Sequence, residues 1–297
     1  MYRVNNEYSV SKKTNVASLY SYSFWTAGLG LNLGGLSNLG GLLNMRRIIT
    51  AISAIAIVAG AMIPSIAMSS PQYPKGQGDV AAGKNIFFNG KGDVPACSSC
   101  HGQDGMGDDG MGTPRLAGQF YVFLRKQLED FATDKRTDTT MFVMNANAKG
   151  LTSKDREDVA TYLESLATAG REAEWKGSDL KELAANGTEV GQSAKGKSLV
   201  EWGQGNRAKP VPACRSCHGY NGRGAPPIYP IIGQQRYSYL VSQLKKWKDG
   251  SRANDPMGQM RAVARNMTEE DILNAAAYLT NASAYSDGNF FTPYDRH

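Results

Sequence analysis

The sequence predicts an all-α fold made of two tandem copies of one domain, and three observations lead to this prediction. Apolar residues recur at helical spacing, no segment shows the alternating pattern of a β-strand, and one set of residues returns at a fixed offset along the chain. The composition agrees with a globular protein, because 41% of the 297 residues are hydrophobic. Two helical domains in tandem are therefore expected.

The repeat keeps one register, an offset of 116 residues, over about fifty positions. The matched pairs include Pro114 with Pro230, Gln119 with Gln235, Leu124 with Leu240, Gln127 with Gln243, Arg136 with Arg252, Met141 with Met257, Met144 with Met260, Thr152 with Thr268, and Tyr162-Leu163 with Tyr278-Leu279. Chance does not hold register over such a length. We expect an N-terminal extension at 1–67, domains at 68–170 and 186–297, the second with a C-terminal tail, and a linker at 171–185.

Each copy shows the same succession of helices. A short helix is expected at 79–88 and again at 190–202, followed by a glycine-rich loop after each cysteine motif. Next comes a helix with apolar residues at helical spacing, as in Phe120, Phe123, Leu124, Leu128 and Phe131 of the first copy. The last helix begins after Thr152 or Thr268, because a threonine followed by aspartate three residues later is a variant of the capping box.

The N-terminal extension contains a predicted export signal. Arg46 and Arg47 precede an uncharged apolar run at 48–68, and Ser65-Ile66-Ala67 offers the small residues that a signal peptidase reads. We expect cleavage after Ala67. The alternative is an uncleaved membrane anchor, because the run is about the 20 residues that cross a bilayer. Either interpretation exports the rest of the chain from the cytoplasm.

The four cysteines lie in two copies of C-x-x-C-H, and this motif indicates covalent haem attachment. The copies are Cys97-Ser98-Ser99-Cys100-His101 and Cys214-Arg215-Ser216-Cys217-His218. Two thiols three residues apart can form thioethers to the two vinyl groups of one porphyrin, and the adjacent imidazole then faces the iron. The alternatives are a thioredoxin-like redox pair, a zinc site of four thiolates, and structural disulfides. None of them explains a histidine after both pairs, so two covalently bound haems are predicted.

The charge distribution argues against a nucleic-acid partner. The formal net charge is +6, but +4 of it lies in residues 1–67. Residues 68–170 carry 11 basic and 13 acidic side chains, and residues 171–297 carry 17 and 13, so the two halves have net charges of −2 and +4. A total of +2 gives no polyanion-binding surface. The opposite signs could orient the protein between two different partners.

Together the motifs resemble the cytochrome c4 family. The resemblance rests on the two C-x-x-C-H-G motifs, on Pro-Arg-Leu-Ala-Gly-Gln at 114–119, and on the Gln-Leu helices followed by methionine and a threonine-capped helix, within 78–282. It implies two class I cytochrome c domains related by a pseudo-twofold axis, each with a histidine- and methionine-ligated haem, in a periplasmic electron carrier. Two departures are Ile231-Ile232-Gly233-Gln234 in place of Arg-Leu-Ala-Gly, and a tail at 283–297.

The sixth ligands are predicted to be methionines. His101 and His218 are used on the proximal side, and the third histidine, His297, is the terminal residue, so no pair of histidines remains for two distal positions. Methionine is a soft neutral ligand, and the candidates are Met141 or Met144 in the first copy and Met257 or Met260 in the second. The resemblance to cytochrome c4 favours the methionine eight residues before the capping threonine, which selects Met144 and Met260.

The expected function is one-electron transfer and not catalysis. An iron with both axial positions filled has no open site for oxygen or peroxide, and a methionine ligand raises its potential relative to two histidines. The expected partners are an electron donor such as a cytochrome complex and an acceptor such as a terminal oxidase or reductase of a respiratory chain, with membrane association if the signal stays attached. Two rivals remain: a cytochrome subunit of a dehydrogenase or flavocytochrome complex, and a dihaem peroxidase.

Overall fold

The computed structural model describes residues 76–137, 143–166 and 176–282, which all fall in the compact unit from Met68 to His297. We call 76–166 the first lobe and 176–282 the second lobe. The predicted export signal with its cleavage site after Ala67, the C-terminal tail, Met141 and His297 lie outside the described residues.

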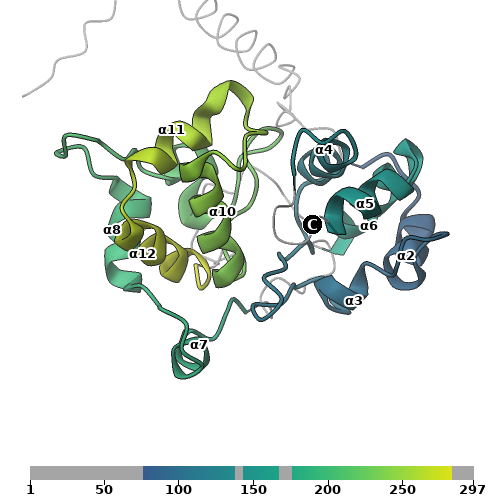
Figure 1. The fold of residues 1–297 in the computed structure, drawn as a ribbon, viewed down its shortest axis with the longest axis horizontal. Coiled ribbons are helices and arrows are strands. Elements are labelled where there is room, and N and C mark those ends of the chain that lie inside the picture. The colour runs from purple at the N-terminus through teal and green to yellow at the C-terminus, as the bar shows by residue number, and fades with distance from the viewer. Residues whose placement is uncertain (1–75, 138–142, 167–175, 283–297) are drawn as a thin grey trace, which may run out of the picture. The chain divides into compact units, whose positions relative to one another are not determined.

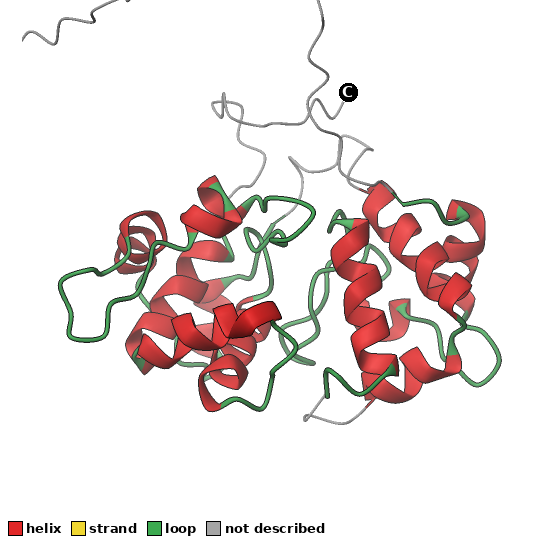
Figure 2. Ribbon diagram, turned by 90° about the horizontal axis from the view of Figure 1, so that it is seen from above, coloured by secondary structure: helices red, strands yellow, loops and turns green. Residues whose placement is uncertain are grey.

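The described residues form helices and loops and contain no β-strand beyond isolated bridges, so the predicted all-α class is confirmed (Figures 1 and 2). The first lobe contains α2 (Val80–Asn89), α3 (Ser98–His101), α4 (Tyr121–Ala132), α5 (Val143–Gly150) and α6 (Ser153–Ser165). The second contains α7 (Leu180–Ala185), α8 (Ser193–Trp202), α9 (Arg215–His218), η3 (Tyr220–Gly222), α10 (Tyr237–Asp249), η4 (Pro256–Gly258), α11 (Gln259–Asn266) and α12 (Glu269–Leu279). Helices α8 to α12 repeat the order of α2 to α6.

The predicted start of the last helix in each copy is confirmed. The Thr152 hydroxyl accepts from the Asp155 backbone N–H, and the Asp155 carboxylate accepts in return from the threonine backbone N–H. Thr268 and Asp271 form the same reciprocal pair at the start of α12. Such a capping box satisfies two backbone donors that the first helical turn leaves without partners.

In each copy of the repeat, the helix before the cysteine motif packs against the last helix at a glycine. Helix α2 packs on α6, and α8 packs on α12. A Cβ atom added to Gly83 would lie 2.0 Å from the carbonyl oxygen of Asp158, and one added to Gly196 would lie 1.8 Å from that of Asn274. Both glycines are therefore required by the close approach of two backbones.

Each lobe has its own hydrophobic core around this helix pair. The core of the first lobe is formed by Ile86, Phe87, Val94, Tyr121, Leu124, Leu151, Val159, Ala160, Tyr162 and Leu163. The core of the second is formed by Leu199, Val200, Val211, Tyr237, Leu240, Met267, Ile272, Ala275, Ala276, Ala277 and Leu279. Many of these residues occupy equivalent positions of the repeat, so the duplicated sequence pattern builds a duplicated core.

The end of the predicted linker packs on the second lobe. The Ser178 backbone N–H donates to the Thr280 hydroxyl at 2.9 Å, and the Ser178 hydroxyl accepts from the Tyr237 backbone N–H at 2.8 Å. Asp179 then caps α7, a short helix that the sequence pattern did not predict. These contacts extend the second lobe on its N-terminal side, into the segment assigned to the linker.

Two buried arginines at equivalent positions of the repeat join the lobes. Arg136 donates to the Oε1 atoms of Gln127 and Gln243 at 2.8 and 3.0 Å. Arg252 donates to the same two oxygens at 3.1 and 2.8 Å. Burial, followed by the charge of Arg136, lowers the pKa of Arg252 to about 9. The reciprocal pattern is what a pseudo-twofold axis between the lobes predicts.

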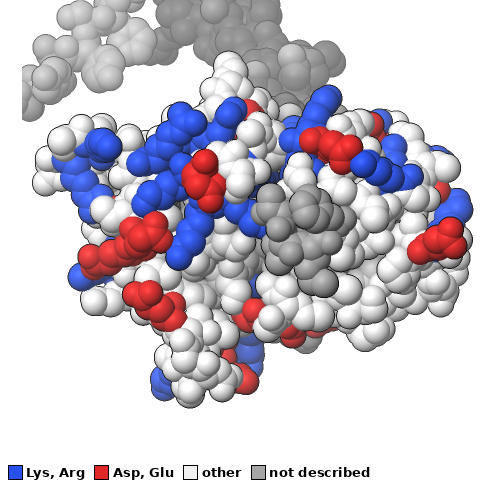
Figure 3. All heavy atoms as spheres, viewed as in Figure 1, with Lys and Arg blue, Asp and Glu red and all other residues white. Residues whose placement is uncertain are grey.

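Basic side chains gather over α10 and α11 of the second lobe (Figure 3). We call this group the basic surface; it comprises Lys245, Lys248, Arg261 and Arg265. Both lysines pair with Glu269, and Arg261 pairs with Asp255 at 2.8 Å. Arg265 is exposed and has no ion pair within the described part of the chain.

Helices α2 to α12 lie within the described ranges 76–137, 143–166 and 176–282. None of the helices in these ranges has the length and apolar content needed to cross a bilayer.

Candidate haem sites

The first C-x-x-C-H motif forms a single helical turn. Cys97 precedes α3, and His101 is its last residue, with the His101 backbone N–H donating to the Cys97 carbonyl oxygen at 3.0 Å. The second motif repeats this turn in α9, where the backbone N–H of His218 donates to the carbonyl oxygen of Cys214 at 2.9 Å. In both turns the two thiols and the imidazole are therefore grouped locally, by the helical turn itself.

All four cysteines are free thiols, with one partly buried and one exposed in each motif. Cys97 and Cys214 are the partly buried members, and burial raises the pKa of each thiol to about 11. Cys100 and Cys217 are exposed. Thioether formation to a haem needs two such thiols on one turn, so the donor set fits covalent haem attachment.

Each motif histidine is fixed by a backbone carbonyl of its own lobe. The His101 Nδ1–H donates to the Pro114 oxygen at 3.1 Å, and the His218 Nδ1–H donates to the Pro230 oxygen at 2.9 Å, with the tautomer assigned from these contacts. Burial lowers the pKa of both imidazoles, which keeps them neutral. Nε2 of each ring then carries the lone pair and is the atom that can bind iron.

The candidate sixth ligands lie on equivalent helices. Met144 is the second residue of α5 and Met260 is the second residue of α11, and both side chains are half-buried. Met257, the alternative in the second lobe, lies in η4 and is 88% exposed. A side chain so exposed is poorly placed to cover a haem face, which favours Met260 and keeps its ligand role a prediction.

The four thiols do not assemble into one metal site. In residues 76–137, 143–166 and 176–282, no group of three or more His, Cys, Asp or Glu side chains is arranged to hold a metal ion.

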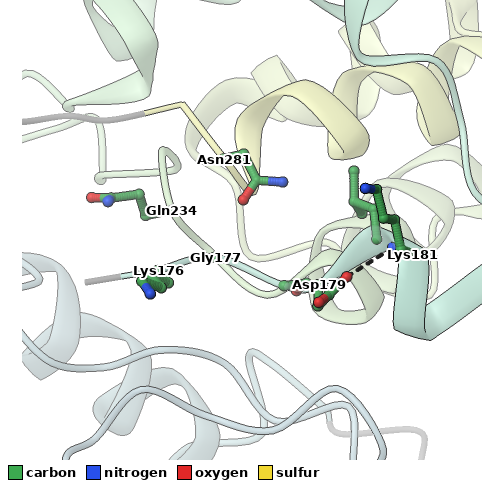
Figure 4. A pocket seen from close by; sticks show the side chains of 8 residues that line it. Lys176, Gly177, Asp179, Lys181, Gln234 and Asn281 are labelled. Atoms are coloured by element: carbon green, nitrogen blue, oxygen red, sulfur yellow. Dashed lines mark hydrogen bonds between the residues drawn. The ribbon is translucent and has the colours of Figure 1, made fainter. Parts of the chain in front are cut away.

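A surface hollow of about 600 Å³ lies elsewhere, at the start of the second lobe (Figure 4). It is lined by residues 176–181, Gln234 and Asn281. The Lys181 backbone N–H donates to the Asp179 carboxylate at 2.9 Å within this lining. None of the cysteines or histidines of the two motifs lines it, and we assign it no role in haem binding.

The residues that hold the motif histidines have no role that the sequence pattern predicts. Pro114 and Pro230 supply the carbonyl oxygens, and Gln119 and Gln235 bind the residues that follow these prolines. All four appeared in the repeat at matching positions. The repeat marked them as shared by both copies, but only the contacts reveal what they do.

Comparison with known proteins identifies both lobes. The sequence profile of the cytochrome c family matches residues 80–167 and again residues 193–283. The two matches correspond to α2–α6 and to α8–α12.

The chain is also similar to curated proteins and to solved structures. The thiosulfate dehydrogenase electron acceptor of Stutzerimonas stutzeri is 31% identical over 71% of this chain and 91% of its own. Cytochrome c4 of Pseudomonas aeruginosa is 29% identical over 68% of this chain and 88% of its own. The structure of reduced cytochrome c4 from Pseudomonas stutzeri has a TM-score of 0.53 at 27% identity and covers 69% of this chain and 99% of its own.

A longer protein also matches. The structure of thiosulfate dehydrogenase (TsdBA) from Marichromatium purpuratum has a TM-score of 0.60 at 31% identity and covers 71% of this chain. The present chain spans only 42% of that protein.

Proposed function

Because the chain belongs to the cytochrome c family, with two domains of the cytochrome c4 type, we propose that it binds two haems and carries single electrons between redox proteins. The observation that supports this most strongly is the duplicated site. Each lobe has two free thiols on one turn and a buried histidine fixed by a proline carbonyl. When bound, each haem supplies an iron that changes oxidation state by one electron.

The residues of the chain determine what such a haem can do. The proline carbonyls fix the tautomer and the orientation of the two imidazoles, leaving Nε2 as the ligating atom. Met144 and Met260 are the residues that would supply the second protein ligand of each iron. With a histidine and a methionine bound, the iron would have no open site for water or peroxide, and the chemistry left to the haem would be one-electron transfer.

The stoichiometry is the direct test of this proposal. We expect a pyridine haemochrome assay on the purified protein to give two haems per chain, because each lobe contains a complete C-x-x-C-H turn. Both should stay attached after acid-acetone extraction, as thioether-linked haem does. One haem per chain, or haem that is extracted, would contradict the proposal.

We propose that the carrier works in the periplasm, because an export signal is predicted before Ala67 and covalent haem attachment is expected there. Cleavage gives a mature protein that starts at Met68, and retention of the apolar run gives a membrane-attached form. An intact mass that starts at Met68 would support cleavage. The proposed donor is a cytochrome complex, and the proposed acceptor is a terminal oxidase or reductase.

A second candidate is the role of electron acceptor for a dehydrogenase. It is favoured by the similarity to two thiosulfate dehydrogenase electron acceptors, at 31% and 35% identity, and by the matching solved structure. Mixing the oxidised protein with thiosulfate and a purified thiosulfate dehydrogenase separates the two roles. Fast reduction of both haems in this mixture supports the second candidate, whereas reduction by a cytochrome complex alone supports the first.

A peroxidase is the weaker alternative, since it needs an iron with a displaceable ligand and a distal acid–base residue. Among the described residues, His101 and His218 are the histidines, and both face the proline carbonyls. Carbon monoxide should therefore leave the spectrum of the reduced protein unchanged.

The basic surface suggests how a partner is recognised. We expect electron transfer to an acidic partner to slow as salt is raised, because salt screens the attraction between surface charges that are more than about 8 Å apart at physiological ionic strength. Arg265→Glu should slow the reaction at low salt, since Arg265 is exposed and has no ion pair within the described residues. The measurement is a stopped-flow rate at low and high salt.

Lys84→Glu is the matched control. Lys84 is also exposed, and its substitution makes the same charge change on the first lobe. Equal slowing in both variants would show that net charge, and not the basic surface, governs the rate. A rate that does not respond to salt would contradict electrostatic steering altogether.

A further inference from the structure

We propose that Gln119 and Gln235 are crossed positioning residues, each of which tunes the haem of the other lobe through the peptide group that anchors its histidine. The proposal deepens the function proposed above and depends on it. It is based on four hydrogen bonds that run between the lobes in a symmetric arrangement, and on two more, one within each lobe.

The side chain of Gln235, in the second lobe, binds the first lobe at Arg115. The Arg115 backbone N–H donates to Gln235 Oε1 at 2.6 Å, and Gln235 Nε2 donates to the Arg115 carbonyl oxygen at 3.0 Å. Both residues are buried, with exposed fractions of 5% for Gln235 and 2% for Arg115. Arg115 directly follows Pro114, whose carbonyl oxygen holds His101.

Gln119, in the first lobe, makes the equivalent contacts with the second. The Ile231 backbone N–H donates to Gln119 Oε1 at 3.0 Å, and Gln119 Nε2 donates to the Ile231 carbonyl oxygen at 2.8 Å. Ile231 directly follows Pro230, which holds His218. Each anchoring loop is therefore bound by a glutamine from the opposite lobe.

Each glutamine is also fixed within its own lobe. Gln119 Oε1 accepts from the Phe120 backbone N–H at 3.0 Å, and Gln235 Oε1 accepts from the Arg236 backbone N–H at 2.9 Å. These N–H groups lie just before α4 and α10. The amide oxygens thus cannot turn away from the opposite lobe without losing a second hydrogen bond.

The backbone geometry of these loops is kept even where the sequence departs from the repeat. Gly118 has φ +71°, and Gln234 at the equivalent position keeps φ +56°. Both backbone N–H groups donate at 2.8 Å to equivalent carbonyl oxygens, those of Leu163 and Leu279. A non-glycine residue in this conformation carries strain, so the surrounding contacts must hold the loop in place.

The coupling passes through one peptide group. The Pro114 carbonyl and the Arg115 N–H belong to the same amide, and a hydrogen bond to the N–H makes the carbonyl oxygen a better acceptor. The His101 Nδ1–H then forms a stronger hydrogen bond to this oxygen. The imidazole becomes more electron-rich, so its Nε2 is a better electron donor to the iron. An electron-rich ligand stabilises the oxidised haem, so the glutamine of the opposite lobe lowers its potential.

Gln235→Leu is the test, with redox potentiometry of the full chain containing both haems as the readout. We expect the midpoint potential of the first-lobe haem to rise while that of the second-lobe haem stays unchanged. Gln119→Leu should give the reverse result. The two haems are assigned by repeating each measurement with Met260→Ala, which is expected to lower the potential of the second-lobe haem.

Gln243→Leu is the matched control, since it removes an interface glutamine that accepts from Arg136 and Arg252 and binds neither anchoring loop. It should leave both potentials unchanged. The inference would be overturned if Gln119→Leu and Gln235→Leu left both potentials unchanged. It would also be overturned if either variant shifted the haem of the lobe that contains the substituted glutamine, or if Gln243→Leu gave an equal shift. The haem content of each variant separates this inference from the proposed function. A variant with two haems and unshifted potentials would contradict the crossed tuning and leave the proposed two-haem carrier intact.

Discussion

Replacing Met260 by alanine is expected to remove about half of the near-infrared sulfur-to-iron absorption of the oxidised protein and to lower the potential of one haem. The reason is that a thioether stabilises the reduced iron, and the side chain of alanine cannot ligate. Met144→Ala should remove the other half and lower the potential of the other haem. Absorption spectra and redox potentiometry of both variants provide the measurement.

Met257→Ala is the control for this assignment, because Met257 lies three residues before Met260 and is 88% exposed. Its spectrum should match that of the parent protein. Full absorption in both Met144→Ala and Met260→Ala would instead transfer the ligand role to Met141 and Met257.

Placing a methyl group at Gly196 is expected to destabilise the second lobe by about 3 kcal/mol, the upper part of the range for an overpacked core. The added Cβ would lie 1.8 Å from the Asn274 carbonyl oxygen, and a backbone atom cannot move aside as a flexible side chain can. Gly196→Ala should therefore separate α8 from α12. The measurement is the free energy of unfolding from denaturant titration of the haem protein.

Gly205→Ala provides the comparison, since a Cβ at Gly205 would meet no atom within 4 Å. We expect its unfolding free energy to stay within about 0.5 kcal/mol of the parent, as for surface substitutions in general. Gly83→Ala should repeat the large effect in the first lobe, where the Cβ would lie 2.0 Å from the Asp158 carbonyl oxygen. A stable Gly196→Ala variant would mean that the helices can shift apart without loss of packing.

Local signals predicted the helices well, because their causes are local. The capping boxes at Thr152 and Thr268 use atoms three residues apart, so the spacing alone locates the starts of α6 and α12. Helix α7 was missed, since only six residues form it and they sit in a segment that looked like a linker. A helix of that length has little propensity of its own and depends on its Asp179 cap and its neighbours.

The candidate site was predicted in part, and the division follows sequence distance. The two thiols and the imidazole of each motif lie within five residues, so one turn brings them together. The Pro114 oxygen, in contrast, reaches His101 across 13 residues, and Gln235 reaches Arg115 across 120. Contacts between residues so far apart in the chain cannot be predicted from residue spacing, even though Pro114 and Gln235 occupy matched positions of the repeat.

By itself, the sequence determined the all-α class, the duplication, the two C-x-x-C-H turns and the helix starts, because all of these depend on residues close together in the chain or on a repeated register. Only the tertiary structure decided which carbonyls fix the histidines, why Gly83 and Gly196 are glycines, and that Gln119 and Gln235 cross between the lobes. These features depend on backbones that approach one another after folding, where a separation of an ångström decides whether a hydrogen bond forms or two atoms collide.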